Sequence, residues 1–225
     1  HNKMTGELKK SSLKRLKYTE NTKFFKGLQV KSAVIAGTNI YSDIIKYAEK
    51  NSADLIVMGT KGTSTFGKAF IGSKTERVIR FTDIPVLAIR GKTGVTKIKK
   101  VVYASEDFTK ESLKVYPAIN NIIKPYDPVI YLLTVNSKNK FKSFKLIKRD
   151  MDRFSKKFSG RFIPRVRANN ETDEGIANFA KSIKADMIAI GLRRKKGLRR
   201  ILGSRIAEGV IRLTNIPVLA VDIPK

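Results

Sequence analysis

The amino-acid sequence predicts an α/β protein built from two doubly wound parallel-sheet units, in which helices cover both faces of each sheet. Two observations support this prediction. Short β-rich runs alternate along the chain with stretches of helical periodicity, and the later part of the sequence repeats the earlier part. The 225 residues are long enough for two small domains, and a hydrophobic share of 41% is typical of globular proteins.

The repeat emerges without a gap when the sequence is shifted by 132 residues against itself. The run Ala53–Gly59 then falls on Ala185–Gly191, and Ile84–Ile89 falls on Ile216–Val221. A gap-free match of this length indicates an internal duplication rather than a shared composition. We expect two units, covering residues 1–92 and 97–225.

In the second copy, strand-like and helix-like segments alternate. The continuous apolar run Val129–Val135 is typical of a buried parallel strand. The other expected strands are Ile98–Ala104, Phe162–Arg167, Met187–Ile190 and Val218–Val221, and the expected helices include Glu111–Ile123, Glu174–Ile183 and about Ser204 to Leu213. A further helix carries Phe141, Phe144, Ile147, Met151, Phe154 and Phe158, whose spacing of three or four residues predicts one buried face.

A unit of this kind orders its strands 3-2-1-4-5. About 36 residues of the second copy, Lys97 to Leu132, have counterparts that would precede His1, so the first copy lacks strands 1 and 2. We expect either an upstream segment or another chain to supply them. The last strands of the two copies, Val86–Ile89 and Val218–Val221, would each be an exposed edge, so we expect them to pair antiparallel as an internal pseudo-dimer.

Composition excludes several kinds of protein. The chain has no cysteine, and its single histidine is His1, so thiol chemistry, Ser–His catalysis and histidine zinc sites have no suitable residues. No apolar run approaches the length that spans a bilayer, and no signal peptide is visible. We expect a cytoplasmic protein with no membrane insertion in this chain, and not an enzyme, because no complete catalytic set is present.

A glycine pattern follows the strand-like run of the first copy. Gly59, Gly62, Gly72 and Ser73 have the spacing Gly-x2-Gly-x9-Gly-Ser. Glycines let backbone N–H groups approach phosphate oxygens closely, and the start of a following helix adds positive potential. The alternative is that these glycines only permit tight turns. The overlapping run Gly62–Ala69 resembles a Walker A loop but ends in alanine, without the hydroxyl that would bind magnesium.

The segments Asp54–Gly62, Gly72–Ser73 and Ile84–Leu87 resemble the universal stress protein family, specifically a tandem member, over essentially the whole chain. The resemblance implies an adenine nucleotide alpha hydrolase-like fold and a stress-response regulatory protein that binds ATP or a related adenine nucleotide, with or without Mg²⁺, through the first unit. Slow hydrolysis of ATP stays open. The ligand residues that it implies are Met58, Gly59, Gly62, Gly72, Ser73 and Lys74.

The second copy departs from this pattern. The resemblance implies an acidic residue after strand 1 that meets the nucleoside, and the second copy has it at Asp107. Its glycine loop is degraded, however, because Arg194 and Ser204 stand where the first copy has Gly62 and Gly72. We therefore interpret the second site as vestigial, formed by Asp107, Gly191, Gly203 and Ser204, and expect at most one nucleotide per chain. The first copy as given has the loop without its acid, which predicts weak or absent affinity.

The net charge of +28 leaves other functions open. Such a charge attracts anions in general, including nucleic acid and acidic lipid. The basic run Arg193–Arg200 is either a solvated loop or a contact for nucleic acid, acidic lipid or an acidic partner. For Lys138–Arg149, rich in lysine and phenylalanine, a core helix is favoured over base stacking. The chain could also be a homodimer or the cytoplasmic part of a transporter.

Overall fold

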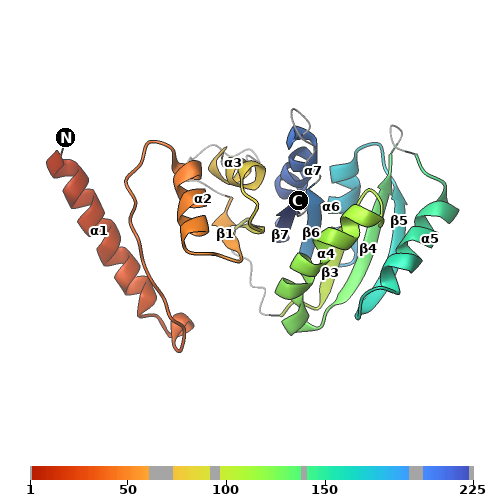
Figure 1. The fold of residues 1–225 in the computed structure, drawn as a ribbon, viewed down its shortest axis with the longest axis horizontal. Coiled ribbons are helices and arrows are strands. Elements are labelled where there is room, and N and C mark those ends of the chain that lie inside the picture. The colour runs from red at the N-terminus through yellow and green to blue at the C-terminus, as the bar shows by residue number, and fades with distance from the viewer. Residues whose placement is uncertain (1, 61–72, 92–96, 138–140, 193–199, 223–225) are drawn as a thin grey trace. The chain divides into compact units, whose positions relative to one another are not determined.

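The computed structural model describes residues 2–60, 73–91, 97–137, 141–192 and 200–222 (Figure 1). The chain divides into two compact units, His1–Asp43 and Ile44–Lys225. The larger unit holds all of the second copy together with the later half of the first. Within the residues described, no helix is both long and apolar enough to cross a membrane.

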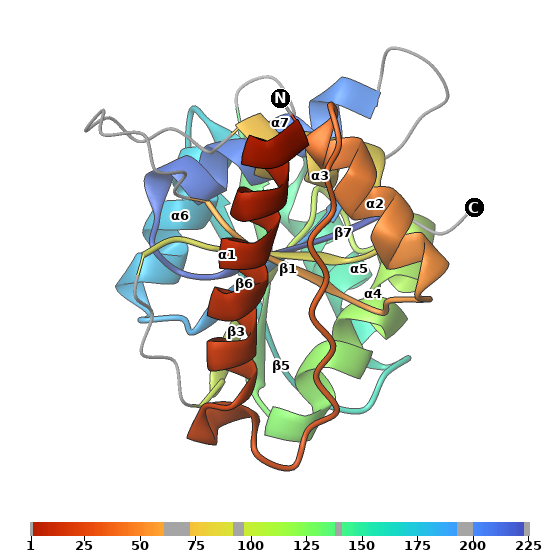
Figure 2. The same cartoon turned by 90° about the vertical axis from the view of Figure 1, so that its left-hand side faces the viewer.

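The smaller unit is a long helix followed by an extended segment (Figure 2). Helix α1 spans Asn2–Glu20, and a short 3-10 helix, η1, spans Lys23–Phe25. None of residues 6–43 is buried, and residues 29–37 form no regular secondary structure. At the 132-residue offset, this extended segment corresponds to the third strand of the second copy. It forms no strand here, which follows from the lack of a neighbouring strand to bond with.

The larger unit contains one sheet of seven strands in the order β1-β2-β7-β6-β3-β4-β5. The strands are β1 (Ile56–Gly59), β2 (Val86–Ile89), β3 (Lys100–Ala104), β4 (Val129–Asn136), β5 (Arg161–Ala168), β6 (Met187–Leu192) and β7 (Val218–Asp222). The helices are α3 (Ser73–Phe81), α4 (Lys110–Ile123), α5 (Phe144–Ser155), α6 (Thr172–Ser182) and α7 (Arg200–Leu213), with η2 at Lys124–Tyr126, and α2 (Ile40–Lys50) leads into the unit. The five strands of the second copy follow the predicted order 3-2-1-4-5, which is confirmed.

The two copies meet where their last strands pair. Strands β2 and β7 are antiparallel, with Leu87 opposite Leu219 at the centre of the ladder. These two leucines are equivalent at the 132-residue offset, so the seam has local two-fold pseudosymmetry, as an isologous interface does. The predicted antiparallel pairing of the last strands is confirmed. It joins what would otherwise be two open edges.

Helices α3 and α7 pack together above this seam (Figure 1). Arg80 of α3 reaches across to Glu208 of α7, with Nη2 and Oε1 3.0 Å apart, and also binds Glu76 at 2.6 Å. Glu76 and Glu208 are equivalent in the two copies, so one arginine holds both members of a symmetric pair. Its own counterpart, Arg212, is exposed.

The core of the second copy is rich in aromatic rings. Tyr103 of β3, Tyr116 of α4 and Phe154 of α5 are fully buried, and their ring centroids lie 5.1 to 5.9 Å apart. Buried residues of α4 and α5 share this cluster with one face of the sheet. On the other face, Phe179 of α6 packs edge-on against Tyr131 of β4. Helices thus cover both faces of the sheet, as the alternating pattern predicts.

The aromatic stripe of α5 is buried over only part of its length. Ile147, Met151 and Phe154 are buried, as predicted, but Phe141 and Phe144 are 78% and 64% exposed. The prediction of a fully buried face was therefore wrong for these two residues. Helix α5 begins only at Phe144, where the Ser143 hydroxyl caps it by accepting from the Leu146 N–H. Phe141 precedes the helix, and the stripe contacts the core only from Ile147 onward.

The first copy shows an uncovered surface where the second copy has its middle strands. Val57 of β1 is 56% exposed, whereas its counterpart Ala189 of β6 is fully buried. Ala189 pairs with Tyr103 of β3, but within the described part of the chain β1 pairs only with β2. Residues of the first copy therefore lie open where the second copy covers them with β3 and α4.

Candidate functional site

In the first copy, the carboxyl end of β1 is tied to the first turn of α3. The Thr75 hydroxyl donates a hydrogen bond of 3.2 Å to the carbonyl oxygen of Gly59. The N–H of Thr60 donates to the Ile89 carbonyl at 2.9 Å, which continues the β1–β2 ladder past Gly59. The carboxyl end of β1 and the start of α3 therefore lie side by side, and we call this place the β1–α3 corner. α/β sheets bind ligands at the carboxyl ends of their strands. The free N–H groups of a helix start favour an anion there.

Open space and an unused hydroxyl mark this corner. Among the described residues, no atom lies within 4 Å of a Cβ atom added at Gly59. Thr60 is buried, and among the described residues its hydroxyl has no hydrogen-bond partner. Buried hydroxyl groups normally have one. In the described part of the chain, the corner therefore combines a glycine with open surroundings and a buried hydroxyl that has no partner.

The structure places four of the six residues predicted for this site. Met58 lies in β1, half-buried, and Gly59 ends that strand. Ser73 begins α3, and Lys74 is exposed in its first turn. Gly62 and Gly72 lie outside the described residues. Thr60 and Thr75 were not predicted, although both are hydroxyl residues within three positions of a motif residue, which is a signal that could have found them.

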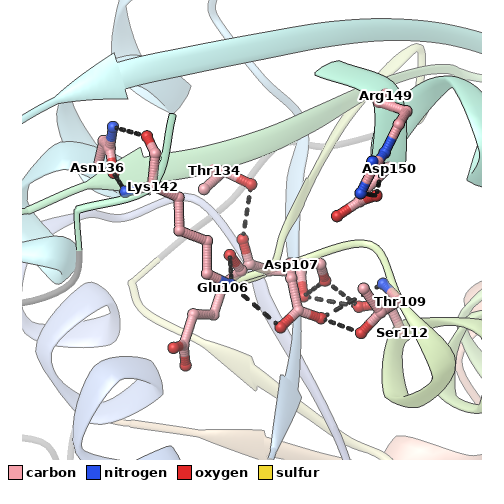
Figure 3. Close-up of polar contacts among 10 residues, drawn as sticks. Glu106, Asp107, Thr109, Ser112, Thr134, Asn136, Lys142, Arg149 and Asp150 are labelled. Atoms are coloured by element: carbon pink, nitrogen blue, oxygen red, sulfur yellow. Dashed lines mark hydrogen bonds and ion pairs between the residues drawn. The ribbon is translucent and has the colours of Figure 1, made fainter. Parts of the chain in front are cut away.

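In the second copy, the carboxylate of Asp107 is already engaged by the protein itself (Figure 3). Its Oδ1 accepts hydrogen bonds from the Thr109 N–H at 3.3 Å and the Thr109 hydroxyl at 2.6 Å. Its Oδ2 lies 3.3 Å from the ammonium of Lys142, and the side chain is only 14% exposed. Both oxygens therefore have partners, and a ligand would have to compete with a cation for Oδ2.

Lys142 is held in this position by the end of β4 (Figure 3). The Asn136 side chain brackets its backbone, accepting from the Lys142 N–H and donating to its carbonyl oxygen, both at 2.8 Å. Its ammonium also reaches the carbonyl oxygen of Glu106 at 3.5 Å. Lys142 was missed as a site residue. The available signal was that it follows β4, whose carboxyl end lies beside that of β3.

Hydroxyl groups fix the backbone around Asp107. Ser105 and Ser112 both donate to the carbonyl oxygen of Asp107, and the Thr134 hydroxyl donates to that of Ser105 at 3.0 Å. The Tyr103 hydroxyl donates to the carbonyl oxygen of Ser112 at 3.2 Å. Burial raises the pKa of Tyr103 above its ordinary value, so the phenol stays a neutral donor. The loop that follows β3 is therefore held in place by hydrogen bonds, and the Asp107 carboxylate within it already has partners in the protein.

Gly191, one of the residues predicted for the second site, has closer neighbours than Gly59 of the first. A Cβ added at Gly191 would lie 3.4 Å from the Val115 side chain of α4. Gly203 and Ser204 lie within α7, which begins at Arg200 rather than at the expected Ser204. Residues 193–199 of the basic run lie outside the described residues. No group of acidic or histidine side chains suited to a metal occurs in the ranges that the structure describes.

Comparison with solved structures gives a close match for the fold. A universal stress protein from Archaeoglobus fulgidus DSM 4304 matches with a TM-score of 0.74 at 22% identity, over 98% of this chain and 79% of that one. A putative universal stress protein from Pseudomonas aeruginosa UCBPP-PA14 gives 0.71 at 17% identity, over 92% and 77%. Two universal stress proteins in complex with cAMP and dAMP give lower TM-scores of 0.46 and 0.41.

The sequence matches point the same way. Universal stress proteins MJ0577 and MJ0531 of Methanocaldococcus jannaschii are 33% identical over 93 residues and 38% identical over 64 residues, which cover 41% and 28% of this chain. The chain spans 54% and 37% of these relatives' own lengths. The sequence profile of the universal stress protein family matches residues 2–90 and 122–222, one segment in each copy. This chain therefore belongs to the universal stress protein family, as a tandem member.

Proposed function

We propose that this chain is a cytoplasmic, non-catalytic regulatory protein of the stress response that binds ATP or a related adenine nucleotide through its first copy. The observation that carries the proposal is the bond from the Thr75 hydroxyl to the Gly59 carbonyl oxygen, which keeps the start of α3 at the end of β1. A phosphate group there would meet the N–H groups of the helix start, which favour negative charge. Gly59 leaves room for that approach.

Side chains of the same corner suit a nucleotide. The exposed Lys74 in the first turn of α3 adds a positive charge that favours a phosphate group. Gly62, Gly72 and Ser73 complete the phosphate loop in the proposal. Mg²⁺, where present, would come with the nucleotide phosphates, because the described residues provide no cluster of carboxylates for it.

The second copy is proposed not to bind nucleotide. Its loop has Arg194 and Ser204 where the phosphate loop needs glycine, and a side chain as long as that of Arg194 would fill the space that glycine leaves open. Its Asp107 is paired with Lys142 at 3.3 Å. A nucleoside that donates to this carboxylate would first have to displace the ammonium group, whose partner would then be lost. One nucleotide per chain is therefore the proposed limit.

A substitution at Gly59 tests the function without disturbing the fold. Because a Cβ at Gly59 would meet no atom of the described residues, Gly59→Gln is expected to fill the open corner and to leave the packing of β1 and α3 intact. Gly6 of α1 is also open to a Cβ, so Gly6→Gln is the matched control. Saturation-transfer NMR of ATP, which detects weak binding, is expected to give a signal with the unmodified chain and with Gly6→Gln, and little with Gly59→Gln. Equal signals from all three proteins would contradict the proposal.

A further inference from the structure

One edge of β1 is free, whereas the equivalent strand of the second copy has partners on both sides. Strand β6 pairs with β7 and also with β3, in parallel, with Ala189 opposite Tyr103. In the described part of the chain, β1 pairs only with β2. Val57, the counterpart of Ala189, is 56% exposed. The second copy therefore shows which neighbour would fit this edge, namely a parallel strand on the side away from β2.

A carboxylate holds the first residues of that neighbour in the second copy. Asp186, the residue before β6, accepts hydrogen bonds at its Oδ2 from the backbone N–H groups of Lys99 and Lys100, at 2.8 and 2.9 Å. Its own N–H donates to the carbonyl oxygen of Lys100 at 2.9 Å. Hydrogen bonds to a charged acceptor are stronger than those between neutral groups. Asp186 thus fixes the start of β3 beside the start of β6.

The first copy has the same carboxylate in the same backbone setting. Asp54 is the counterpart of Asp186 at the 132-residue offset. The turns before these two residues match, because Ser52 and Lys184 have φ angles of 50° and 52°, and in each copy the next N–H donates at 2.9 Å to a carbonyl oxygen of the preceding helix. Asp54 is exposed, and no described residue bonds to its carboxylate. It therefore offers an acceptor that the described chain does not use.

The backbone of β1 has a bonding group on the same side. The N–H groups of Ile56 and Thr60 donate to the carbonyl oxygens of Pro85 and Ile89, both at 2.9 Å, on the β2 side. Successive residues of a strand direct their N–H groups to opposite sides, so that of Val57 points to the free edge. The carboxylate and this N–H together can bind the backbone of an added strand.

The two edges of the sheet differ in their protection against strand pairing. Strand β5, at the other edge, contains Pro164, which has no N–H to donate, and three exposed arginines, Arg161, Arg165 and Arg167. Proline and charged side chains protect edge strands that stay unpaired. Strand β1, with the sequence Ile-Val-Met-Gly, has neither. The composition of β1 therefore suits a strand that is paired on both sides.

We propose that the free edge of β1 binds an apolar β-strand of another polypeptide, which adds in parallel and places two consecutive backbone N–H groups on the Asp54 carboxylate. The second copy gives the register: Val101 follows the two donors and lies opposite Met187, so the third residue of the added strand lies opposite Leu55. In such strand addition the main-chain hydrogen bonds supply affinity.

The partner is not the β3 strand of a second copy, because β3 already pairs with both β4 and β6. The proposal is also independent of nucleotide binding. Asp54 precedes β1, whereas Gly59, which belongs to the β1–α3 corner, ends it.

A fluorescent peptide with the sequence of residues 97–105 is the probe, because it contains β3 and both N–H groups that Asp186 holds. Fluorescence anisotropy is expected to show saturable binding to the chain. Asp54→Ala is expected to weaken it about tenfold or more, because a charged acceptor is lost. Asp152→Ala, which removes an exposed carboxylate of α5, is the matched control and is expected to change nothing. A peptide methylated on the backbone nitrogen of Lys100 is expected to bind more weakly to the unmodified chain, with little further loss in Asp54→Ala.

Variants of the two edge strands locate the bound peptide. Val57→Pro removes the N–H that points to the free edge and is expected to abolish binding, whereas Val166→Pro, in β5, is expected to keep it. Hydrogen exchange followed by NMR is expected to show that the peptide slows exchange at Val57. Absence of saturable binding, or equal affinities of Asp54→Ala and Asp152→Ala, would overturn the proposal. If the chain sediments as a dimer that Val57→Pro dissociates, a second copy occupies the edge and the proposal is wrong.

Discussion

Arg80 at the seam between the copies allows a quantitative test of how the two halves of the sheet are held together. Glu208 is a nearly buried carboxylate, with 9% of its side chain exposed, and Arg80 lies 3.0 Å from it. Arg80→Met removes the cation and leaves this carboxylate uncompensated. Breaking a buried ion pair from one side costs about 3–5 kcal/mol. Because the arginine is itself 25% exposed, we expect a cost below that range, about 2–3 kcal/mol of unfolding free energy.

The internal repeat supplies the matched control for this substitution. Arg212→Met changes the equivalent residue of the second copy, which is exposed, so its cost is expected to be within about 0.5 kcal/mol. The double variant Arg80→Met with Glu208→Gln is expected to recover part of the loss, because no unpaired charge then remains. The assay is urea unfolding followed by circular dichroism. If Arg80→Met and Arg212→Met cost the same, the reasoning about the seam is refuted.

Two further predictions concern the aromatic core of the second copy. Phe154→Ala is expected to lower the unfolding free energy by about 3–5 kcal/mol, whereas Phe144→Ala, on the exposed end of the same helix, is expected to change it by about 0.5 kcal/mol or less in the same urea assay. Burial raises the pKa of Tyr116 to about 12, so the folded state keeps this proton when the unfolded state has lost it. Stability should therefore fall as the pH rises from about 10 to 12, and base titration of Tyr116→Phe should show a shallower loss; an unchanged profile would contradict the assignment to Tyr116.

The architecture could be predicted because the sequence contains an internal repeat. The alternation of apolar runs and helical stretches indicated which segments of the second copy are strands and which are helices. The 132-residue offset then located their counterparts in the first copy. The pairing of β2 with β7 followed from a simple argument, since two apolar edge strands cannot both stay open. Leu87 does lie opposite Leu219, its own counterpart. The division of the chain at residues 92 and 97 stays a prediction, as does a homodimer.

Periodicity could not show where α5 meets the sheet. The spacing of Phe141, Phe144 and Ile147 identifies one face of a helix, but not the position at which that face leaves the core. That position depends on where the helix starts, and the start depends on the cap at Ser143. The two exposed phenylalanines were therefore predicted wrongly, for a reason that lies in tertiary packing.

The ligand residues Met58, Gly59, Ser73 and Lys74 stay predictions, which rest on the family resemblance and on the glycine pattern that follows a strand. The side-chain partners in the two copies could not be predicted. The pairing of Asp107 with Lys142 joins two loops, 35 residues apart, that only the order of the sheet brings together. No local pattern marks that lysine as the partner. The bond from Thr75 to Gly59 likewise depends on where the helix begins.

The central claim is that one nucleotide binds, and that it binds in the first copy. Calorimetric titration of ATP into the chain and into two variants tests this claim most directly. Gly62→Glu places a carboxylate in the proposed phosphate loop, and Arg194→Glu makes the same change at the equivalent position of the second copy. We expect Gly62→Glu to abolish binding, and Arg194→Glu to leave the affinity unchanged with at most one nucleotide bound per chain. Loss of binding in Arg194→Glu alone would place the site in the second copy and contradict the account.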